Sequence, residues 1–293
     1  MERLLVVGPG DVARRALPAL VARYETLALV RGESARAVIE GLGARTAVGD
    51  LDRPESLAAL AGSADAVLHL APPDETRDGD VRTRNLIAAL ARAPMLPRRI
   101  VYISTSGVYG DCGGARVDES RPVNPQSARA ARRVDAERAL VEWGARAGVE
   151  VTILRVPGIY AADRLPVERL RRGTPVLRDE DDVYTNHIHA EDLAAIAVRA
   201  LDPDAPPGLY NASDDSELKM GEWFDLVADR FALPRPPRIA RADAGRLVPP
   251  MLLSFMSESR RLVNRRIKDA LGIVLRYPTV FDGVPHAAAE SAQ

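Results

Sequence analysis

The chain has 293 residues, with 41 acidic and 40 basic side chains and a formal net charge of −1. Such a chain can bury a large core, and its balanced charge gives no reason to expect nucleic acid or an anionic membrane as a partner. Its single cysteine, Cys112, excludes an internal disulfide and a cysteine-based metal site, and we predict no metal site of any kind. The sequence lacks a run of about 18 apolar residues and a signal-peptide pattern, so we expect a soluble cytoplasmic protein.

The first fifteen residues are typical of a dinucleotide-binding unit. A strand pattern at Leu4 to Val7 is followed by the turn Gly8-Pro9-Gly10-Asp11-Val12-Ala13 and by a helical pattern from Arg14 to Ala22. Gly8 allows a sharp turn, Gly10 lets the backbone approach a diphosphate, and the start of the helix offers unpaired N–H groups. A glycine turn can also merely connect two elements, but its place between a clear strand and a clear helix favours nucleotide binding. We therefore predict cofactor contacts at Gly8, Gly10, Asp11 and Val12.

The second predicted strand, Thr26 to Val30, ends at a residue that bears on the choice of cofactor. Arg31 follows the strand, where an acidic residue would hold the ribose of NAD and an arginine can pair with the 2′-phosphate of NADP. Arg31 therefore favours NADP. NAD is the alternative, with Arg31 a solvated charge and Glu33 on the ribose.

Further cofactor contacts are predicted at the ends of the next two strands. After a helix at Ser34 to Leu42 and a strand at Arg45 to Val48, Asp50 and Leu51 occupy a turn. The Asp50 carboxylate could accept a hydrogen bond from the adenine amino group, or it could simply form the turn. After the strand at Ala66 to Leu70, Ala71 and Pro72 are expected to shape the wall beside the ribose. His69, inside that strand, is predicted to be a structural core residue.

Strand and helix patterns continue to alternate, which predicts an α/β fold with a doubly wound parallel sheet. The later elements are expected at Asp80 to Ala93, Arg98 to Ile103, Ser127 to Ala147, Val149 to Leu154, Arg164 to Arg172, a helix ending near Leu201, Leu209 to Asn211, Met220 to Phe231 and about Ser259 to Leu271. We predict a Rossmann domain at residues 1–165, to which 187–212 return. Residues 166–186 and 213–285 form a smaller C-terminal substrate-binding part, and 286–293 form a tail.

Several short motifs, taken together in this order, resemble the extended short-chain dehydrogenase/reductase family, which includes NAD(P)-dependent epimerases and dehydratases. The motifs are the glycine turn, Gly49-Asp50-Leu51, Ser104-Thr105-Ser106-Gly107-Val108-Tyr109-Gly110, Arg155-Val156-Pro157-Gly158-Ile159-Tyr160, His187-Ile188-His189-Ala190-Glu191-Asp192-Leu193 and Tyr210-Asn211. The turn Gly-x-Gly-x-x-Ala is closer to the atypical members of the family. The resemblance implies an NADP-binding oxidoreductase or epimerase-like protein with a small-molecule substrate, a cofactor contact at Pro157 and a homodimer.

In that family a tyrosine acts as the general acid or base, a lysine four residues later lowers the tyrosine pKa, and a serine or threonine holds the substrate oxygen. The resemblance places Arg129 in the tyrosine position, Arg133 in the lysine position and Thr105 in the serine/threonine position. A guanidinium does not release its proton at neutral pH, so Arg129 cannot replace the phenol as a base. Arg133 can still hold a ribose or a phosphate.

Three explanations of this departure remain open. Tyr109 or Tyr160 could supply a displaced phenol, and these two residues with Thr105 are the predicted catalytic residues. His187 or His189 could act as the acid or base because histidine titrates near neutral pH, although both are more simply interpreted as packing residues at a helix entrance. Finally, the protein could be a non-catalytic NAD(P)-binding regulatory or scaffold protein.

Overall fold

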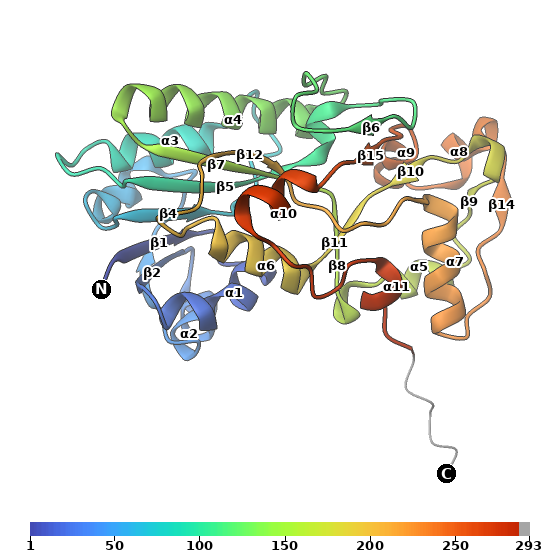
Figure 1. Ribbon diagram of the computed structural model, residues 1–293, viewed down its shortest axis with the longest axis horizontal. Helices are drawn as coiled ribbons and strands as arrows, with labels where there is room; N and C mark the ends of the chain where they lie inside the picture. Colours follow the sequence, from blue (N-terminus) through green and yellow to red (C-terminus); the bar gives the residue numbers. More distant parts are fainter. Residues whose placement is uncertain (287–293) are drawn as a thin grey trace, which may run out of the picture.

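A computed structural model describes residues 1–286 and has a seven-stranded parallel sheet at its centre (Figure 1). The strand order is β12-β7-β5-β4-β1-β2-β3, which is the order of a doubly wound sheet. The strands are β1 (Arg3–Val7), β2 (Glu25–Val30), β3 (Arg45–Val48), β4 (Ala66–His69), β5 (Arg99–Thr105), β7 (Glu150–Val156) and β12 (Gly208–Asn211). The predicted fold class is therefore confirmed.

The central strands are apolar throughout because helices cover both faces of the sheet. In β1 the four residues from Leu4 to Val7 are fully buried, and they alternate between two separate hydrophobic clusters. One face is covered by α1 (Asp11–Val21), α2 (Glu33–Gly41) and α6 (Ala190–Arg199). The other is covered by the 3₁₀ segment η1 (Pro54–Leu60), α3 (Val81–Leu90) and α4 (Ala128–Ala147), as Figure 1 shows.

A second, smaller part with its own hydrophobic cluster lies beyond the carboxyl ends of the strands (Figure 1). Its strands pair only two at a time. They are β6 (Arg116–Val117), β8 (Gly158–Tyr160), β9 (Val176–Leu177), β10 (Tyr184–Thr185), β11 (His187–His189), β13 (Leu218–Lys219), β14 (Arg238–Ile239) and β15 (Arg261–Leu262). Its helices are α5 (Val167–Arg171), α7 (Met220–Arg230), α8 (Arg241–Leu247), α9 (Pro250–Phe255) and α11 (Val280–Gly283). The remaining 3₁₀ segments are η2 (Ser106–Tyr109), η3 (Ala162–Arg164) and η4 (Asp179–Asp181).

The C-terminal stretch differs from its prediction. The helix expected from Ser259 to Leu271 is instead the strand β15 followed by the shorter helix α10 (Arg265–Leu271). Strand β15 pairs with β6, a partner more than 140 residues away, and this pairing overrides the local helical pattern. Ile267 and Leu271 of α10 pack in the cluster beneath the central sheet, so residues 213–285 contribute to both parts of the molecule. The predicted tail lies, from residue 287 on, outside the described residues.

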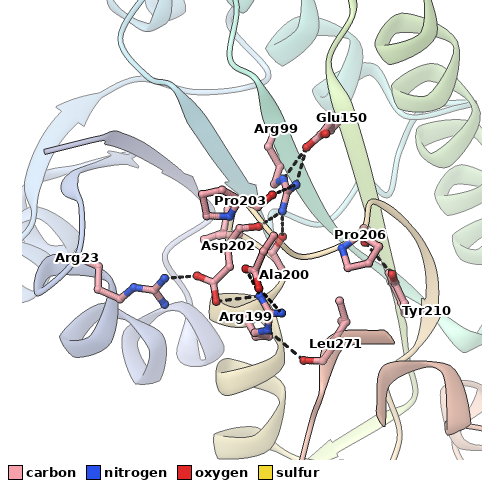
Figure 2. A network of polar contacts seen from close by, with 12 residues as sticks. Arg23, Arg99, Glu150, Arg199, Ala200, Asp202, Pro203, Pro206, Tyr210 and Leu271 are labelled. Carbon is pink, nitrogen blue, oxygen red and sulfur yellow. Dashed lines mark hydrogen bonds and ion pairs between the residues drawn. The ribbon is translucent and has the colours of Figure 1, made fainter. Parts of the chain in front are cut away.

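A buried arginine joins the amino-terminal edge of the sheet to the end of α6 (Figure 2). Arg99, at the start of β5, is 4% exposed and pairs with Glu150 at the start of β7. Its guanidinium also donates to the main-chain carbonyls of Ala200, Asp202 and Pro203 just beyond α6. Cations are favoured at a helix carboxyl terminus, where carbonyl groups lack partners. This network lies at the edge of the sheet opposite the carboxyl ends of its strands.

Within residues 1–286, no helix combines the length and the apolar character that crossing a bilayer would require.

Candidate functional site

A cavity of about 820 Å³ lies between the carboxyl ends of the strands and the smaller part. It is lined at one end by the glycine turn and at the other by residues of α7, α9 and the segment before β15. Ligands of doubly wound sheets bind at this edge, where the strand order reverses. Of the predicted site residues, those that line the cavity are Gly8, Gly10, Asp11, Val12, Thr105, Arg133, Pro157 and Tyr160.

Glycine occupies the two positions of the first turn for different structural reasons. Gly8 has φ +81°, and a Cβ on it would lie 2.5 Å from the main-chain nitrogen of Ala71. Gly10 has φ −79° and ψ −159°, which any residue can adopt, and a Cβ on it would meet only the Gly8 carbonyl at 4.0 Å. Gly8 is thus required by the fold, whereas Gly10 keeps open the space in front of the first helix.

The N-terminus of α1 faces the cavity and bears an ion pair that bridges the two parts of the molecule. The Asp11 carboxylate pairs with Arg164 of η3 at 2.8 Å and with Arg15 at 3.2 Å. Partial burial raises the pKa of Asp11, but the hydrogen bonds from both arginines outweigh it and lower that pKa below its usual value. Arg164 therefore lies over the turn that the sequence predicts for the diphosphate.

The predicted adenosine contacts lie at the ends of β2, β3 and β4, outside the cavity lining. Arg31 is exposed and has no hydrogen bond or ion pair within residues 1–286. The Asp50 carboxylate accepts from the backbone N–H of Asp52 at 3.0 Å, so it does form its own turn. Leu51 is buried in the core beneath the sheet. These placements leave Arg31 as the only one of the three side chains that is free to meet a charged ligand.

Two more predicted contacts follow β4. Ala71 is buried and lies against Gly8, while Pro72 is exposed and its carbonyl accepts from Arg82 at 3.1 Å. Ala71 therefore packs against the glycine turn, and neither residue is in the cavity lining. His69 is fully buried, and its Nε2 lies 2.9 Å from the Thr83 hydroxyl, in line with a structural role.

The hydroxyl-bearing tip of β5 enters the cavity, but Tyr109 does not. Thr105 lines the cavity, and its hydroxyl accepts from the Gly107 N–H at 3.2 Å. Tyr109 is 1% exposed, and its hydroxyl donates to Asn211 at 2.8 Å. Burial raises the pKa of Tyr109 and outweighs the nearby Arg155 guanidinium, which acts to lower that pKa, so Tyr109 stays a neutral phenol. The prediction of a catalytic Tyr109 conflicts with this placement, because η2 turns its side chain into the small cluster behind the strand tip.

Tyr160 lines the cavity with its ring, while its hydroxyl lies against α11. That hydroxyl donates to the Thr279 carbonyl at 3.3 Å, and a Cβ on Gly283 would lie 2.4 Å from the same oxygen. Burial and nearby carboxylates raise the pKa of Tyr160 well above its usual value. Tyr160 is therefore a neutral phenol whose hydroxyl is engaged by the main chain, which does not suit a proton donor. The sequence could not show this, because Thr279 lies more than 100 residues further along the chain.

The two histidines of β11 serve the packing of the smaller part. His189 accepts the Glu191 N–H at 3.2 Å and so caps α6. His187 lines the cavity with its ring centre 4.4 Å from that of Trp223, and burial lowers its pKa to about 3. A histidine with so low a pKa is neutral at physiological pH, and the structure favours the packing interpretation for both residues.

The arginines at the start of α4 occupy the positions that the family resemblance gives to tyrosine and lysine. Arg133 donates to the Tyr102 hydroxyl at 2.9 Å and to the Ile103 carbonyl at 2.8 Å, which holds it against β5. The guanidinium of Arg129 lies 4.8 Å from the ring centre of Phe255 on α9. Both line the cavity, and neither has a carboxylate partner within residues 1–286. These unpaired charges suit an anionic group of a cofactor or substrate.

Sequence reasoning missed the far wall of the cavity. Its lining residues there include Tyr184, Trp223, Phe224, Phe255 and Arg260. They come from four separate segments that only the tertiary fold brings together, and no local motif marks them. No cluster of three or more potential metal-binding side chains occurs in the described part of the chain.

The fold and its first turn define an NAD(P)-binding protein of the short-chain dehydrogenase/reductase type. A family described as NAD(P)H-binding matches residues 8–204, and the chain belongs to that family. The predicted resemblance to NAD-dependent epimerases and dehydratases is confirmed.

Individual relatives extend over nearly the whole chain. The 3-diazoavenalumate denitrifying reductase of a Streptomyces species is 28% identical over 306 residues, covering 96% of this chain and 99% of the relative. A conserved protein of unknown function from Silicibacter pomeroyi superposes with a TM-score of 0.78 at 29% identity, covering 97% of this chain and 96% of that chain. The UDP-glucose 4-epimerase of Thermus thermophilus in complex with NAD gives a TM-score of 0.77 at 21% identity over 97% of both chains, and at that identity it shows the fold alone.

Proposed function

We propose that this protein is an NADP(H)-dependent reductase that transfers hydride to a small organic substrate without a phenol as proton donor. The observation that carries this proposal is Arg129, which lines the cavity at the position that the family resemblance gives to the tyrosine. The two phenols predicted as substitutes, Tyr109 and Tyr160, both direct their hydroxyls away from the cavity. A permanently charged guanidinium stabilises negative charge, but it cannot exchange a proton near neutral pH.

The residues of the turn and of α4 would hold the cofactor. The open space at Gly10 and the free N–H groups of the first turn of α1 fit a diphosphate, and Arg133 fits a ribose or phosphate. Arg31 is exposed and has no partner within residues 1–286, so it is free to meet a 2′-phosphate, which supports NADP over NAD. When bound, the reduced nicotinamide supplies a hydride equivalent.

The absence of a phenol at the family position narrows the class of reaction. Reduction of a carbonyl produces an alkoxide that needs a proton, and epimerisation begins by removing one. Some substrates gain hydride at a carbon while a leaving group departs with the bonding electrons. Such a reaction needs neither a proton donor nor a base. Loss of dinitrogen from a diazonium carbon is such a reaction: the C–N bond breaks, a C–H bond forms, and the charge of the diazonium is cancelled. The name of the Streptomyces relative describes a reductase that removes nitrogen from a diazo compound.

Thr105 and Arg129 are the residues that we expect to touch the substrate. Thr105 ends β5 and places its hydroxyl at the cavity wall, where it can hold a polar group of the substrate. Arg129 lies one helical turn before Arg133, so a group bound to Arg129 lies beside the cofactor held by Arg133. Tyr184 also lines the cavity, at its far end on β10, and its hydroxyl makes no hydrogen bond within residues 1–286.

Cofactor oxidation with a panel of substrates tests the proposal. The protein with NADPH is offered an aryl diazonium carboxylate and a set of ketones and aldehydes, and nicotinamide absorbance and dinitrogen release are followed. With the diazonium we expect NADPH to be oxidised in an amount equal to the dinitrogen released. Tyr184→Phe should leave the rate of NADPH oxidation unchanged. Because diazonium salts also react without enzyme, Thr105→Val and Arg129→Gln serve as the matched protein controls.

Two other results would reject the proposal. If the protein reduces carbonyl compounds and Tyr184→Phe abolishes that activity, the Tyr184 phenol is the proton donor. Tight NADPH binding without turnover of any substrate would favour the alternative, a non-catalytic NADP-binding regulatory or scaffold protein. A homodimer and a cytoplasmic location stay predictions.

A further inference from the structure

We infer that the far half of the cavity binds a compact aromatic substrate carrying a single negative charge, held by Arg129 and Arg260. This inference rests on the proposed reductase function, because it names the substrate class of the same site. It is carried by the charges and the aromatic side chains that meet there, none of which belongs to the cofactor turn.

Arg129 provides an unpaired cation over an aromatic surface. Its guanidinium lies 4.8 Å from the ring centre of Phe255, and no carboxylate within residues 1–286 pairs with it. Both side chains are exposed in the cavity rather than packed in the core. A guanidinium stacked on a ring keeps its N–H groups in its own plane, so they stay available for a carboxylate.

Arg260 provides a second cation, which is fixed in place. It is 9% exposed, and its Nη1 donates to the Gly110 carbonyl at 2.7 Å and to Glu258 at 2.8 Å. Its Nη2 makes no hydrogen bond with any described residue, and its Nε is buried without a partner. Asn186 accepts the N–H of Leu262 and donates to the Arg260 carbonyl, which anchors this segment from both sides.

The balance of these charges favours a monoanion. Glu258 neutralises one of the two guanidinium groups, so Arg129 and Arg260 together leave one uncompensated positive charge. A diphosphate would bring more negative charge than this pair can match, and it would lie beside the Glu258 carboxylate, which also lines the cavity. A single carboxylate is the better electrostatic match.

The remaining wall is built for an aromatic ring. Although aromatic residues make up only 4% of the chain, Tyr160, Tyr184, Trp223, Phe224 and Phe255 all line this cavity. The ring centre of Trp223 lies 4.4 Å from that of His187, with the two planes tilted by 35°, and 5.5 Å from that of Tyr160, with the two planes at 65°. A wall of tilted and edge-to-face rings offers both ring faces and ring edges to an aromatic ligand. The same cavity must also admit the nicotinamide end of the cofactor, so the substrate is compact.

Calorimetric titration with four probes tests the inference on the full chain, with and without saturating NADP. The probes are 4-hydroxycinnamate, its methyl ester, the aliphatic acid octanoate and UDP-glucose. We expect 4-hydroxycinnamate to bind about tenfold more tightly than its ester, because one charge-assisted interaction is lost in the ester. It should also bind more tightly than octanoate and UDP-glucose.

Charge and ring variants assign the effect to residues. Arg129→Gln should remove the difference between acid and ester, and Arg260→Gln should reduce it. The matched control Arg132→Gln removes the same charge from the same helix outside the cavity lining and should change nothing. Phe255→Leu should weaken the binding of 4-hydroxycinnamate but not the binding of octanoate.

The inference is overturned if acid and ester bind equally well, if Arg129→Gln leaves the acid affinity unchanged, or if UDP-glucose binds more tightly than the acid. NADP binding is measured in the same titrations. NADP binding that fails in these titrations, or NADPH that is not oxidised with the aryl diazonium carboxylate, would reject the reductase function but not the site for the anion.

Discussion

Arg155 pairs with Glu137 at 2.7 Å, and both side chains are buried directly behind the strand tip that bears Thr105. Glu137 also accepts from the Ser104 hydroxyl, so one carboxylate joins β5, β7 and α4. The pair therefore fixes the position of α4, with Arg129 and Arg133, relative to the cavity.

Breaking this pair should be more damaging than replacing it. Glu137→Gln leaves the Arg155 charge buried without a counter-charge, and we expect it to lower the free energy of unfolding by about 3 kcal/mol. The double variant Glu137→Gln/Arg155→Met removes both charges and should regain part of that loss. Urea unfolding measures both variants. Equal or greater instability of the double variant would contradict the charge argument.

The two glycines of the first turn should separate stability from cofactor binding. Gly10→Val points its side chain into open cavity, so the melting temperature should stay within a few degrees while NADPH affinity falls at least about tenfold. Gly8→Ala should instead cost about 2 kcal/mol of stability, because its Cβ meets Ala71 at positive φ. Thermal unfolding and calorimetric titration check the pair. Unchanged NADPH affinity of Gly10→Val would show that the diphosphate does not lie at this turn.

Arg31 should set the preference for NADP. Removing its charge in Arg31→Ala is expected to weaken NADPH binding about tenfold while leaving NADH binding unchanged, since only NADPH carries the 2′-phosphate. Arg36→Ala is the matched control, because Arg36 is already engaged with Glu40 at 2.9 Å. Parallel titrations with both cofactors measure the effect. An equal loss of affinity for both cofactors would show that Arg31 does not contact the 2′-phosphate.

The phenol of Tyr160 should be dispensable for turnover. Its hydroxyl is bonded to Thr279, and the nearby carboxylates and burial keep it protonated, so Tyr160→Phe should keep the rate within about threefold. The measurement is steady-state NADPH oxidation with any substrate that the protein accepts. If Tyr160→Phe instead caused a large drop in turnover and removed the pH dependence of the rate, Tyr160 would be the general acid.

Buried His69 should make stability depend on pH. Burial lowers its pKa from 6.5 to about 3, so the unfolded chain takes up a proton below 6.5 that the folded chain does not. This contribution to stability is therefore present above pH 6.5 and is lost as the pH falls toward 3, by about 1.4 kcal/mol per pH unit. His69→Gln can keep a hydrogen bond to Thr83 without titrating. Urea unfolding of both proteins at about pH 7 and about pH 5 should show a smaller pH effect in the variant.

Local pattern was sufficient for much of the fold. Each strand of the central sheet and the helices that flank it begin within a few residues of their predicted positions, because apolar periodicity and glycine turns act over short distances. The short strands of the smaller part were not predicted, and β15 among them exists only through its pairing with β6. Pairing between segments so far apart leaves no periodic signal in either of them.

The candidate site likewise has one part that the sequence predicts and one part that only the tertiary structure shows. The glycine turn, Arg31, Thr105 and the arginines at positions 129 and 133 could be named from the sequence, since each belongs to a short motif next to a strand or helix end. The directions of the Tyr109 and Tyr160 hydroxyls were decided by Asn211 and Thr279, which no local rule connects to them. The aromatic and cationic far wall likewise exists only where α7, α9 and the segment at Arg260 meet. Hydrogen-bond partners and packing contacts between distant segments depend on the completed fold, and for that reason the sequence alone determined the cofactor cradle while tertiary structure decided what the cavity can bind.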